Sequence, residues 1–544
     1  HNDTTAGTAS SFLINLTAQV INPVSVDVEL VIDRSGSMSE ASGSRIKIDT
    51  ALDAARLFVE LSRPDVEDRI GLVRFNNSPE VIPSYGIQFI IAANHASIKN
   101  QLNAGNYTPA GATSIAGGVI VAENNIGANA RATPPPALNK IILVLTDGKD
   151  NSPYTNPADG QTYSLLGGFN WFPPSVTLPL PVPTDIKIYS IGIGDNIDIG
   201  RLAQLAASTG GAFLQAKTFS GNDYFNLEKQ FTQVYMEAVN YAPISDPVFT
   251  ILAGETHYFE FEVLAGDKSA MVVVYDREGI RLPFWIISPL GEIVDLLSVP
   301  AGFQIRPGTS PTARFIEINM PQHEPERYAG TWKIEIKHEG RACISGREEA
   351  NKVIAGNLYG SGFQPTHCKP FDQPIMYGIA IGVGSNFNMI SYVTPSIVKT
   401  GEPILLTALV SEFGLPVKGC TINIEARRPD GNVSHHILYD DGRHQDDDSD
   451  DGTYAFSYSL TSQEGIYTFK FNSTGKSRDG KTISRELVRS KYVEGRIPLV
   501  EPVPGFSDSK DECCSATSKW VRIGIVLLFI ILIFVFLIWK SLRG

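Results

Sequence analysis

The alternation of strand-like and helix-like segments over residues 25–240 constrains the fold of this chain more than any other feature. β-rich apolar runs alternate there with segments whose apolar residues recur at helical spacing. In chain order these are residues 26–32, 48–61, 69–75, 114–123, 140–145, 187–194, 199–208 and 227–239. Such alternation predicts a parallel sheet covered by helices on both faces, which is a doubly wound, Rossmann-like α/β domain.

The pattern changes near Pro243, after which the chain reads as strand after strand separated by Pro and Gly turns. A length of 544 residues favours several domains. We therefore expect a multi-domain chain in which two all-β sandwiches and one C-terminal membrane helix follow the α/β domain. The expected parts are an N-terminal segment (1–24), the α/β domain (25–242), a β-sandwich (243–345), a connecting segment (346–384), an immunoglobulin- or fibronectin-like sandwich (385–495), a stalk (496–519), a transmembrane helix (520–540) and a cytoplasmic tail (541–544).

An uninterrupted apolar run near the C-terminal end predicts a membrane span. Residues 523–539 carry no charge and are flanked by Lys519 and Arg522 on one side and by Lys540 and Arg543 on the other. At about 1.5 Å per residue the run covers roughly 25 Å, close to the thickness of a bilayer core. Basic residues on both sides leave the orientation undecided by charge.

The orientation is inferred from the large body before the span and from Asn-x-Ser/Thr sequons, which are typical of exported surfaces. The sequons begin at Asn2, Asn15, Asn76, Asn106, Asn432 and Asn472. We therefore expect a single-pass type I glycoprotein of the cell surface with an extracellular N-terminal part. A net charge of -13 argues against nucleic acid as a partner.

The cysteines are too few for a disulfide scaffold. Cys343 and Cys368 flank a Gly-rich segment and are the preferred intrachain bridge, although connectivity cannot be read from sequence. Cys420 lies further on. The adjacent Cys513 and Cys514 precede the predicted span and suggest an interchain disulfide or a vicinal pair.

Polar residues follow two of the predicted strands at the points where ligands bind in parallel sheets. Asp33-Arg34-Ser35-Gly36-Ser37 follows the first strand, and Asp147 follows the strand at 140–145; Thr113 lies in the loop between them. Hydroxyl and carboxylate oxygens suit hard cations such as Mg²⁺. The alternative is that Asp33 and Ser35 only cap the next helix.

These residues resemble the metal-ion-dependent adhesion site of the von Willebrand factor A (VWA) domain, and residues 188–194 resemble a later core strand of that family. The resemblance implies that Ser35, Ser37 and Thr113 bind Mg²⁺, Ca²⁺ or Mn²⁺ directly, with Asp33 and Asp147 acting mostly through water. It also implies that an acidic side chain of a protein ligand completes the coordination.

An insertion over residues 150–185, rich in Pro, Gly and aromatic residues, begins just beyond Asp147. Long loops of this kind are often functional, and clustered aromatic residues favour an interface. We interpret it as a ligand-specificity loop, with a self-packed flap as the alternative. Its aromatic residues include Tyr154, Tyr163, Phe169, Trp171 and Phe172.

An acidic run in the last predicted sandwich favours Ca²⁺ binding, although a solvated acidic turn is nearly as good an interpretation. Its aspartates repel one another unless a cation or solvent screens them, and their spacing does not match an EF-hand. The candidate ligands of this second site are Asp440, Asp441, Asp446, Asp448, Asp450 and Asp451, and Asp447 lies among them.

The acidic run and the whole layout resemble the later portion of the calcium-activated chloride channel regulator family. The chain has no His-Glu-x-x-His motif, so the protease chemistry of that family does not carry over. No P-loop, dinucleotide fingerprint or Gly-x-Ser-x-Gly elbow occurs in a credible context, and we expect no enzymatic activity.

These observations predict metal-dependent, adhesion-type binding of a protein ligand. The alternatives are an accessory subunit docked on a channel or other membrane protein, and a structural surface-coat protein.

Overall fold

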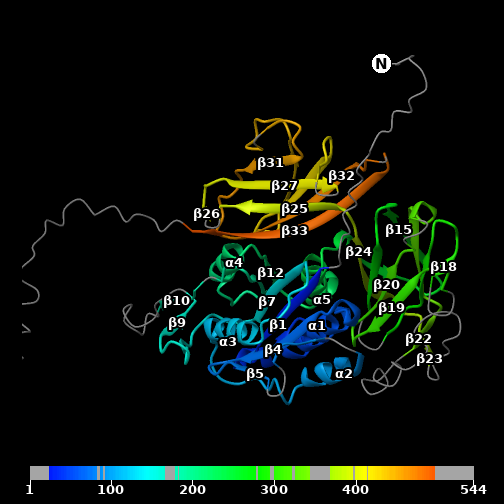
Figure 1. Ribbon diagram of the computed structural model, residues 1–544. Helices are drawn as coiled ribbons and strands as arrows, with labels where there is room; N and C mark the ends of the chain where they lie inside the picture. Colours follow the sequence, from blue (N-terminus) through cyan, green and yellow to red (C-terminus); the bar gives the residue numbers. More distant parts are fainter. Residues whose placement is uncertain are drawn as a thin grey trace, which may run out of the picture. The chain divides into compact units, whose positions relative to one another are not determined.

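The first domain of this computed structural model is built on a seven-stranded sheet in the order β12-β11-β7-β1-β4-β5, with β6 paired to β4 (Figure 1). The central strand β1 is buried along its whole length and lies parallel to both neighbours, and it buries the charged residues Asp27 and Glu29 together with its apolar ones. The strands are β1 (Ser25–Asp33), β4 (Arg69–Phe75), β5 (Glu80–Val81), β6 (Gln88–Phe89), β7 (Leu138–Thr146), β11 (Lys187–Ile193) and β12 (Phe213–Ala216), with a separate hairpin of β2 (Ala41–Ser42) and β3 (Arg45–Ile46).

The structure describes only part of the chain. The described residues are 24–82, 86–89, 92–165, 178–181, 183–276, 280–294, 299–321, 325–343, 368–395, 398–412, 415–446, 448–478 and 480–495.

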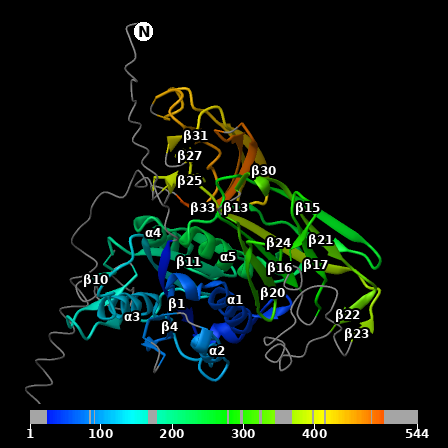
Figure 2. The same cartoon turned by 45° about the vertical axis from the view of Figure 1, so that its right-hand side comes forward.

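Helices cover both faces of this sheet (Figure 2). Helices α1 (Lys47–Leu61), α2 (Ala92–Gln101) and α5 (Asn226–Ala238) pack on the face that carries Leu30. Helices α3 (Ile115–Ala128) and α4 (Ile199–Ser208) pack on the face that carries Val31. The doubly wound α/β prediction is confirmed, and short 3-10 turns add η1 (Gly36–Ser39), η2 (Pro64–Val66) and η3 (Gly221–Asp223).

Local periodicity predicted the long strands and four of the helices but missed helix α2 and the short strands β2, β3, β5, β6 and β12. The strand at 69–75 and the helix at 199–208 have the predicted bounds. Helix α2 was missed because its sequence carries no apolar stripe, and Ile98 is its contribution to the core. Strand β12 was missed because four residues are too few to show a period.

The first β-sandwich pairs a six-stranded sheet, β13-β24-β16-β20-β19 with β14 on β24, with a four-stranded sheet, β15-β21-β17-β18. Trp332 is fully buried between the sheets. The elements are β13 (Ala242–Ser245), β14 (Val248–Ile251), β15 (Thr256–Val263), β16 (Ser269–Asp276), β17 (Phe284–Ile287), β18 (Ile293–Val294), β19 (Gln304–Thr309), β20 (Ala313–Asn319), η4 (Pro325–Arg327), β21 (Gly330–Lys337) and β24 (Ile375–Gly384), with β22 (Arg341–Cys343) and β23 (Cys368–Pro370) as a separate pair.

Strand β24 corrects the predicted connecting segment over 346–384. Its residues lie within that segment, yet they pair with β13, β14 and β16 at the centre of the six-stranded sheet. The sandwich therefore takes a strand from well beyond residue 345. Sequence patterns could not show this pairing because it joins segments more than a hundred residues apart.

The second β-sandwich pairs β25-β27-β28, with β31 on β27, against the sheet β26-β33-β32-β29-β30. Its apolar core lies between the two sheets and includes Leu406 and Phe469. The strands are β25 (Phe387–Thr394), β26 (Val398–Lys399), β27 (Ile404–Glu412), β28 (Leu415–Pro416), β29 (Thr421–Arg427), β30 (Val433–Leu438), β31 (Thr453–Tyr458), β32 (Gly465–Lys476) and β33 (Thr482–Glu494).

Arg306 of the first sandwich joins it to the α/β domain. Its guanidinium donates to the carbonyls of Glu60 (3.0 Å), Leu61 (2.6 Å) and Ser62 (3.3 Å) at the end of α1. It also forms a 2.6 Å ion pair with Glu317. A cation at this position satisfies the last carbonyls of the helix and matches its dipole.

We expect Arg306→Ala to lower the free energy of unfolding by about 2 kcal/mol, because the helix carbonyls and the buried Glu317 carboxylate lose their partner. Chemical denaturation followed by circular dichroism measures the change. The exposed Arg427, whose nearest carboxylate lies 3.7 Å away, provides the matched control Arg427→Ala, for which we expect little change. Equal stability of the two variants would contradict the role assigned to Arg306.

No helix among the described residues is long and apolar enough to cross a membrane. The predicted span at 523–539, the stalk, Cys513 and Cys514 and the tail at 541–544 lie outside the described residues, as do residues 1–23 of the N-terminal segment.

Candidate metal centre

The two polar loops predicted to meet at one sheet edge lie at the carboxyl ends of β1 and β7. Asp33 is the last residue of β1, and Asp147 directly follows β7. The chain leaves β1 for β4 on one side and later returns to β7 on the other, so the strand order reverses at β1. Ligands bind at such reversal points because the flanking loops separate there.

Asp33 lies beneath both loops and connects them. Its carboxylate is fully buried, accepting a hydrogen bond from the Ser35 backbone N–H (2.6 Å) and another from the Thr146 hydroxyl (2.6 Å). Burial raises the pKa of Asp33 to about 7, and the nearby charge of Asp147 adds to the rise. A cation bound beside this carboxylate would offset both effects.

The serine hydroxyls bridge the two loops. Ser35 Oγ and Ser37 Oγ lie 3.3 Å apart, and Ser37 Oγ donates to Asp147 Oδ1 at 2.7 Å. Ser37 lies in the 3-10 turn η1, which turns its side chain back toward β7. The structure thus brings together Asp33, Ser35, Ser37 and Asp147.

Thr113 comes to the same place from a third loop. Its N–H donates to Asn151 Oδ1 (2.8 Å), and its carbonyl accepts from the N–H groups of Asn151 and Ser152 (3.0 Å each). A Cβ atom added to Gly148 would lie 2.9 Å from Thr113 Oγ1, so this hydroxyl lies directly beside the residue after Asp147. Gly148 leaves the space that the hydroxyl needs.

The capping alternative for Asp33 and Ser35 is wrong for helix α1. The N-cap of α1 is Ile46, with no side-chain capping hydrogen bond. Ser35 precedes only the short turn η1, and its hydroxyl makes no capping bond there. The two side chains are therefore directed to the sheet edge.

Lys47 is a member of this centre that the sequence reasoning missed. Its ammonium lies 2.7 Å from Asp147 Oδ2 and 2.9 Å from Glu40 Oε2. Lys47 is the first residue of α1, where a positive charge opposes the helix dipole. A lysine at the start of a predicted helix is unfavourable, and this placement is the feature of the sequence that could have indicated a special role for Lys47.

The donor set fits a hard divalent cation. Asp33, Ser35, Ser37, Thr113 and Asp147 offer only carboxylate and hydroxyl oxygens, which suit Mg²⁺, Mn²⁺ or Ca²⁺ and not a thiolate- or imidazole-binding metal. Among the described residues there is no group of three or more His, Cys, Asp or Glu side chains that could hold a metal. Hydroxyls must therefore supply part of any coordination here.

The described part of the aromatic insertion is packed inward. Strands β8 (Tyr154–Thr155), β9 (Thr162–Ser164) and β10 (Leu178–Pro179) form a small sheet, so the segment is not structureless. Tyr163 is buried, with its hydroxyl donating to Asp159 (2.7 Å), and Tyr154 packs on the same core. These two tyrosines pack inward, as the flap alternative expects, and the role of the loop in ligand choice stays a prediction; Phe169, Trp171 and Phe172 lie outside the described residues.

Asp150 anchors this flap beside the metal centre. Its buried carboxylate accepts from the N–H of Ile115 (2.8 Å), the first residue of α3, and from the N–H of Leu165 (2.6 Å). Burial raises the pKa of Asp150 to about 6. One carboxylate thus ties the helix after the Thr113 loop to the insertion.

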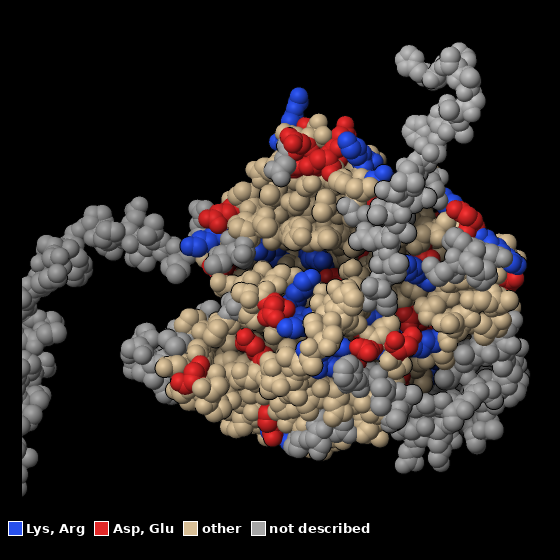
Figure 3. Space-filling view, in the orientation of Figure 1, with Lys and Arg blue, Asp and Glu red and all other residues tan. Residues whose placement is uncertain are grey.

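The acidic loop lies between β30 and β31, and Figure 3 shows acidic side chains gathered at that end of the second sandwich. Its carboxylates bind backbone N–H groups. Asp440 accepts from Asp451 (3.0 Å) and Gly452 (3.1 Å), and the buried Asp446 accepts from Gly442 (2.9 Å). Asp448 and Asp450 are exposed. The loop is therefore held by its own backbone, and its binding of Ca²⁺ stays a prediction.

The predicted sequons differ in accessibility. Asn76 is 6% exposed, and its amide donates to the Ala110 carbonyl (2.8 Å) and accepts from the Ser78 N–H (2.9 Å). The Asn76 amide is thus buried and hydrogen-bonded in the folded domain, and glycosylation at Asn76 stays a prediction. Asn106 is half-buried, and its amide donates a hydrogen bond to the Gln101 carbonyl. Asn432 is exposed, and Asn472 lies in strand β32. Asn2 and Asn15 lie outside the described residues.

The backbone register bears on the proposed disulfide. Strands β22 and β23 are antiparallel, and Cys343 pairs directly with Cys368 across them. Such opposition is compatible with a disulfide, which stays a prediction. Cys420 is a free, buried thiol, and burial raises its pKa.

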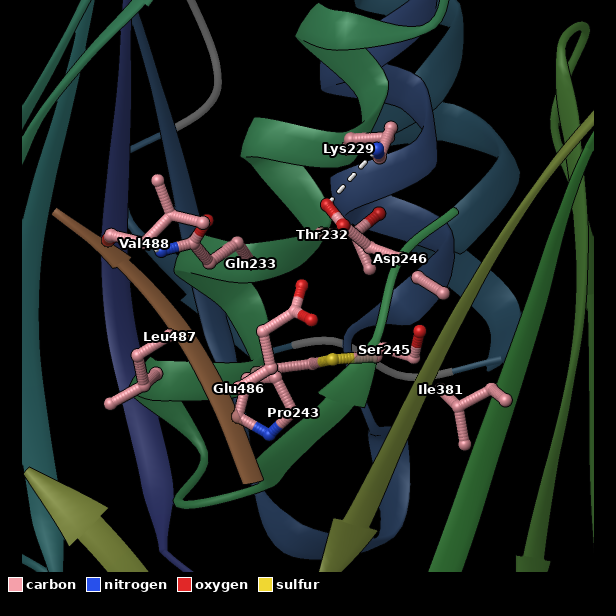
Figure 4. Close-up of a pocket in the computed structure, with 12 residues that line it drawn as sticks. Lys229, Thr232, Gln233, Pro243, Ser245, Asp246, Ile381, Glu486, Leu487 and Val488 are labelled. Atoms are coloured by element: carbon pink, nitrogen blue, oxygen red, sulfur yellow. Dashed lines mark hydrogen bonds and ion pairs between the residues drawn. The ribbon is translucent and has the colours of Figure 1, made fainter. Parts of the chain in front are cut away.

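A small cavity of about 30 Å³ lies among α5, β13, β24 and β33 (Figure 4), and none of the five metal-site residues lines it. Lys229 and Asp246 form a 3.1 Å ion pair at its wall. Glu486 points into it, and burial together with the charge of Asp246 raises the pKa of Glu486 to about 7. The cavity can hold water but is too small for an organic ligand.

The doubly wound sheet and the loops at its edge define an α/β domain of the VWA class. The family model described as von Willebrand factor type A domain matches residues 28–149, so the chain contains a VWA domain. The model described as conditioned medium factor 2nd Ig-like domain matches residues 414–490, within the second sandwich. No curated protein matches the chain.

Solved structures that match this chain share little sequence with it. A von Willebrand factor type A protein from Catenulispora acidiphila is 15% identical. The match covers 72% of this chain and 63% of that protein, with a TM-score of 0.30. Proximal thread matrix protein 1 from the mussel byssus is 17% identical over 42% of this chain and 50% of its own, with a TM-score of 0.28. The pilus adhesin RrgA from Streptococcus pneumoniae is 10% identical. The match covers 87% of this chain and 78% of the adhesin, with a TM-score of 0.29. The chain therefore spans about half to two-thirds of the first two proteins.

Proposed function

We propose that this chain is a surface-displayed binding protein whose VWA domain captures a protein ligand through a divalent cation held by Asp33, Ser35, Ser37, Thr113 and Asp147. The observation that carries the proposal is the convergence of loops far apart in sequence. Ser37 Oγ lies 2.7 Å from Asp147 Oδ1 and 3.3 Å from Ser35 Oγ, above the buried Asp33. We propose a binding role and no catalytic one.

Neutral hydroxyls leave most of the charge on a bound cation. Ser35, Ser37 and Thr113 would hold Mg²⁺, and Asp33 and Asp147 would bind its water ligands and balance part of its charge. The cation would supply an electrophilic position for an acidic side chain of the partner. The protein residues would orient that position and keep it at the sheet edge, where a partner can reach it.

The test is affinity capture by the full chain from a surface-protein extract in Mg²⁺ and in EDTA, followed by mass spectrometry. We expect a partner that is captured in Mg²⁺, released by EDTA and absent with Asp33→Ala. The matched control is Asp49→Ala, in the first turn of α1 outside the five-residue set. Partner capture that ignores both EDTA and Asp33→Ala would leave the structural surface-coat alternative.

The membrane part of the proposal rests on the charge-free run at 523–539 and its basic flanks. We propose that it anchors the chain as a type I protein and that the domains before it face outward. Protease treatment of intact cells should remove the VWA domain and leave a short membrane-bound fragment. Co-purification with a polytopic membrane protein from the same cell would favour the accessory-subunit alternative, as in the chloride channel regulator family.

A further inference from the structure

An ammonium group lies directly on one of the proposed metal-site carboxylates. Lys47 Nζ is 2.7 Å from Asp147 Oδ2, and Ser37 Oγ binds the other oxygen, Oδ1, at 2.7 Å. The same ammonium lies 3.4 Å from the Ser37 carbonyl. Lys47 therefore contacts two residues of the centre.

A backbone hydrogen bond places residue 47 beside the metal-site loops. The N–H of Lys47 donates to the Glu40 carbonyl (3.0 Å), which closes the β2–β3 hairpin between them. The Lys47 side chain is 12% exposed, while that of its second partner, Glu40, is 65% exposed. The hairpin thus positions Lys47 so that its largely buried ammonium group lies at the sheet edge.

We propose that Lys47 is an affinity-setting residue: its ammonium neutralises Asp147 and thereby weakens divalent-cation binding at this site. The inference rests on the proposed metal-binding function. The negative charge of Asp147 is partly neutralised by the Lys47 ammonium, so less of it is available to balance the charge of a bound metal ion. A fixed positive charge beside the site also repels the ion directly.

The expected consequence is a site whose occupancy follows the ion concentration of its surroundings. Without the Lys47 ammonium beside them, the five metal-site side chains would bind the ion more tightly and release it more slowly than they do in the native chain. A unit charge within a few ångströms of a divalent ion changes its affinity by about tenfold or more, even with strong solvent screening.

The test is isothermal titration calorimetry of Mg²⁺ and Mn²⁺ into the full chain and its Lys47 variants. We expect Lys47→Met to bind Mg²⁺ at least about tenfold more tightly, and Lys47→Arg, which keeps the charge, to stay close to the native affinity. The matched control Lys140→Met removes a lysine that pairs with Asp185 (2.6 Å) near the start of β7, the strand whose other end carries the site. It should leave the Mg²⁺ affinity unchanged. Lys47→Gln replaces Lys47→Met if thermal melts show that the methionine variant does not fold.

The outcomes separate this inference from the proposed function. If the native chain binds Mg²⁺ and the neutral variants bind it equally or more weakly, the role of Lys47 is overturned and the metal site stands. If only the neutral variants bind Mg²⁺, the role of Lys47 is supported and metal-dependent capture by the native chain is overturned. If no variant binds either ion, both are overturned.

Discussion

Replacing Ser35 and Ser37 together by alanine is expected to weaken Mg²⁺ binding on the order of 1000-fold, since loss of even one outer-shell partner of a metal site costs about 10- to 100-fold and a direct ligand should cost no less. Both hydroxyls lie at the junction of the loops after β1 and β7, and Ser37 also holds Asp147 at 2.7 Å. Alanine leaves the backbone of η1 intact but removes both neutral oxygens. Isothermal titration calorimetry measures the affinity, and the rise in melting temperature on adding Mg²⁺ provides an independent measure.

Ser39→Ala is the matched control for this experiment. Ser39 lies in the same turn, is exposed, and donates to the Gly36 carbonyl (2.9 Å), so its loss should leave ion binding unchanged. An undiminished Mg²⁺ affinity in the double variant would show that the hydroxyls are not ligands, and the adhesion-type site would have to be abandoned.

Glu29 is expected to make the stability of the VWA domain fall as pH rises. This side chain is fully buried in β1, directly opposite Gly71 in the register with β4, and its Oε1 accepts a hydrogen bond from Asn125. Burial raises its pKa to about 8 from 4.5. The folded state therefore holds a proton that the unfolded state releases, so the stabilisation is complete below about pH 4.5 and is lost as pH rises toward 8.

Glu29→Gln replaces the protonated carboxyl by an amide that cannot ionise and still accepts from Asn125. We expect the native chain to lose about 4 kcal/mol more than this variant between pH 5 and pH 9, an upper estimate from the shift in pKa. Urea denaturation across this range measures the difference. Glu67→Gln, at a 68% exposed side chain, is the control and should follow the native curve. Parallel curves for the native chain and Glu29→Gln would show that Glu29 ionises freely.

Glu29 also explains a glycine in the neighbouring strand. A Cβ atom on Gly71 would lie 2.2 Å from Glu29 Oε1, so the carboxyl occupies the space that a side chain at position 71 would need. The buried carboxyl and the glycine depend on each other. Neither residue indicates this pairing in the sequence, where they lie far apart.

The sequence by itself determined the order and type of the main elements, because periodicity reports which face of each local segment is buried. It also placed Asp33 and Asp147 at one sheet edge, because the carboxyl ends of parallel strands lie at the same edge of the sheet. The tertiary structure decided what long-range packing controls. It placed β24 in the first sandwich, buried Asn76 and Tyr163, and brought Lys47 onto Asp147, a hundred residues away. Contacts of this kind depend on loop paths and on register between distant segments, and no local pattern of residues records them.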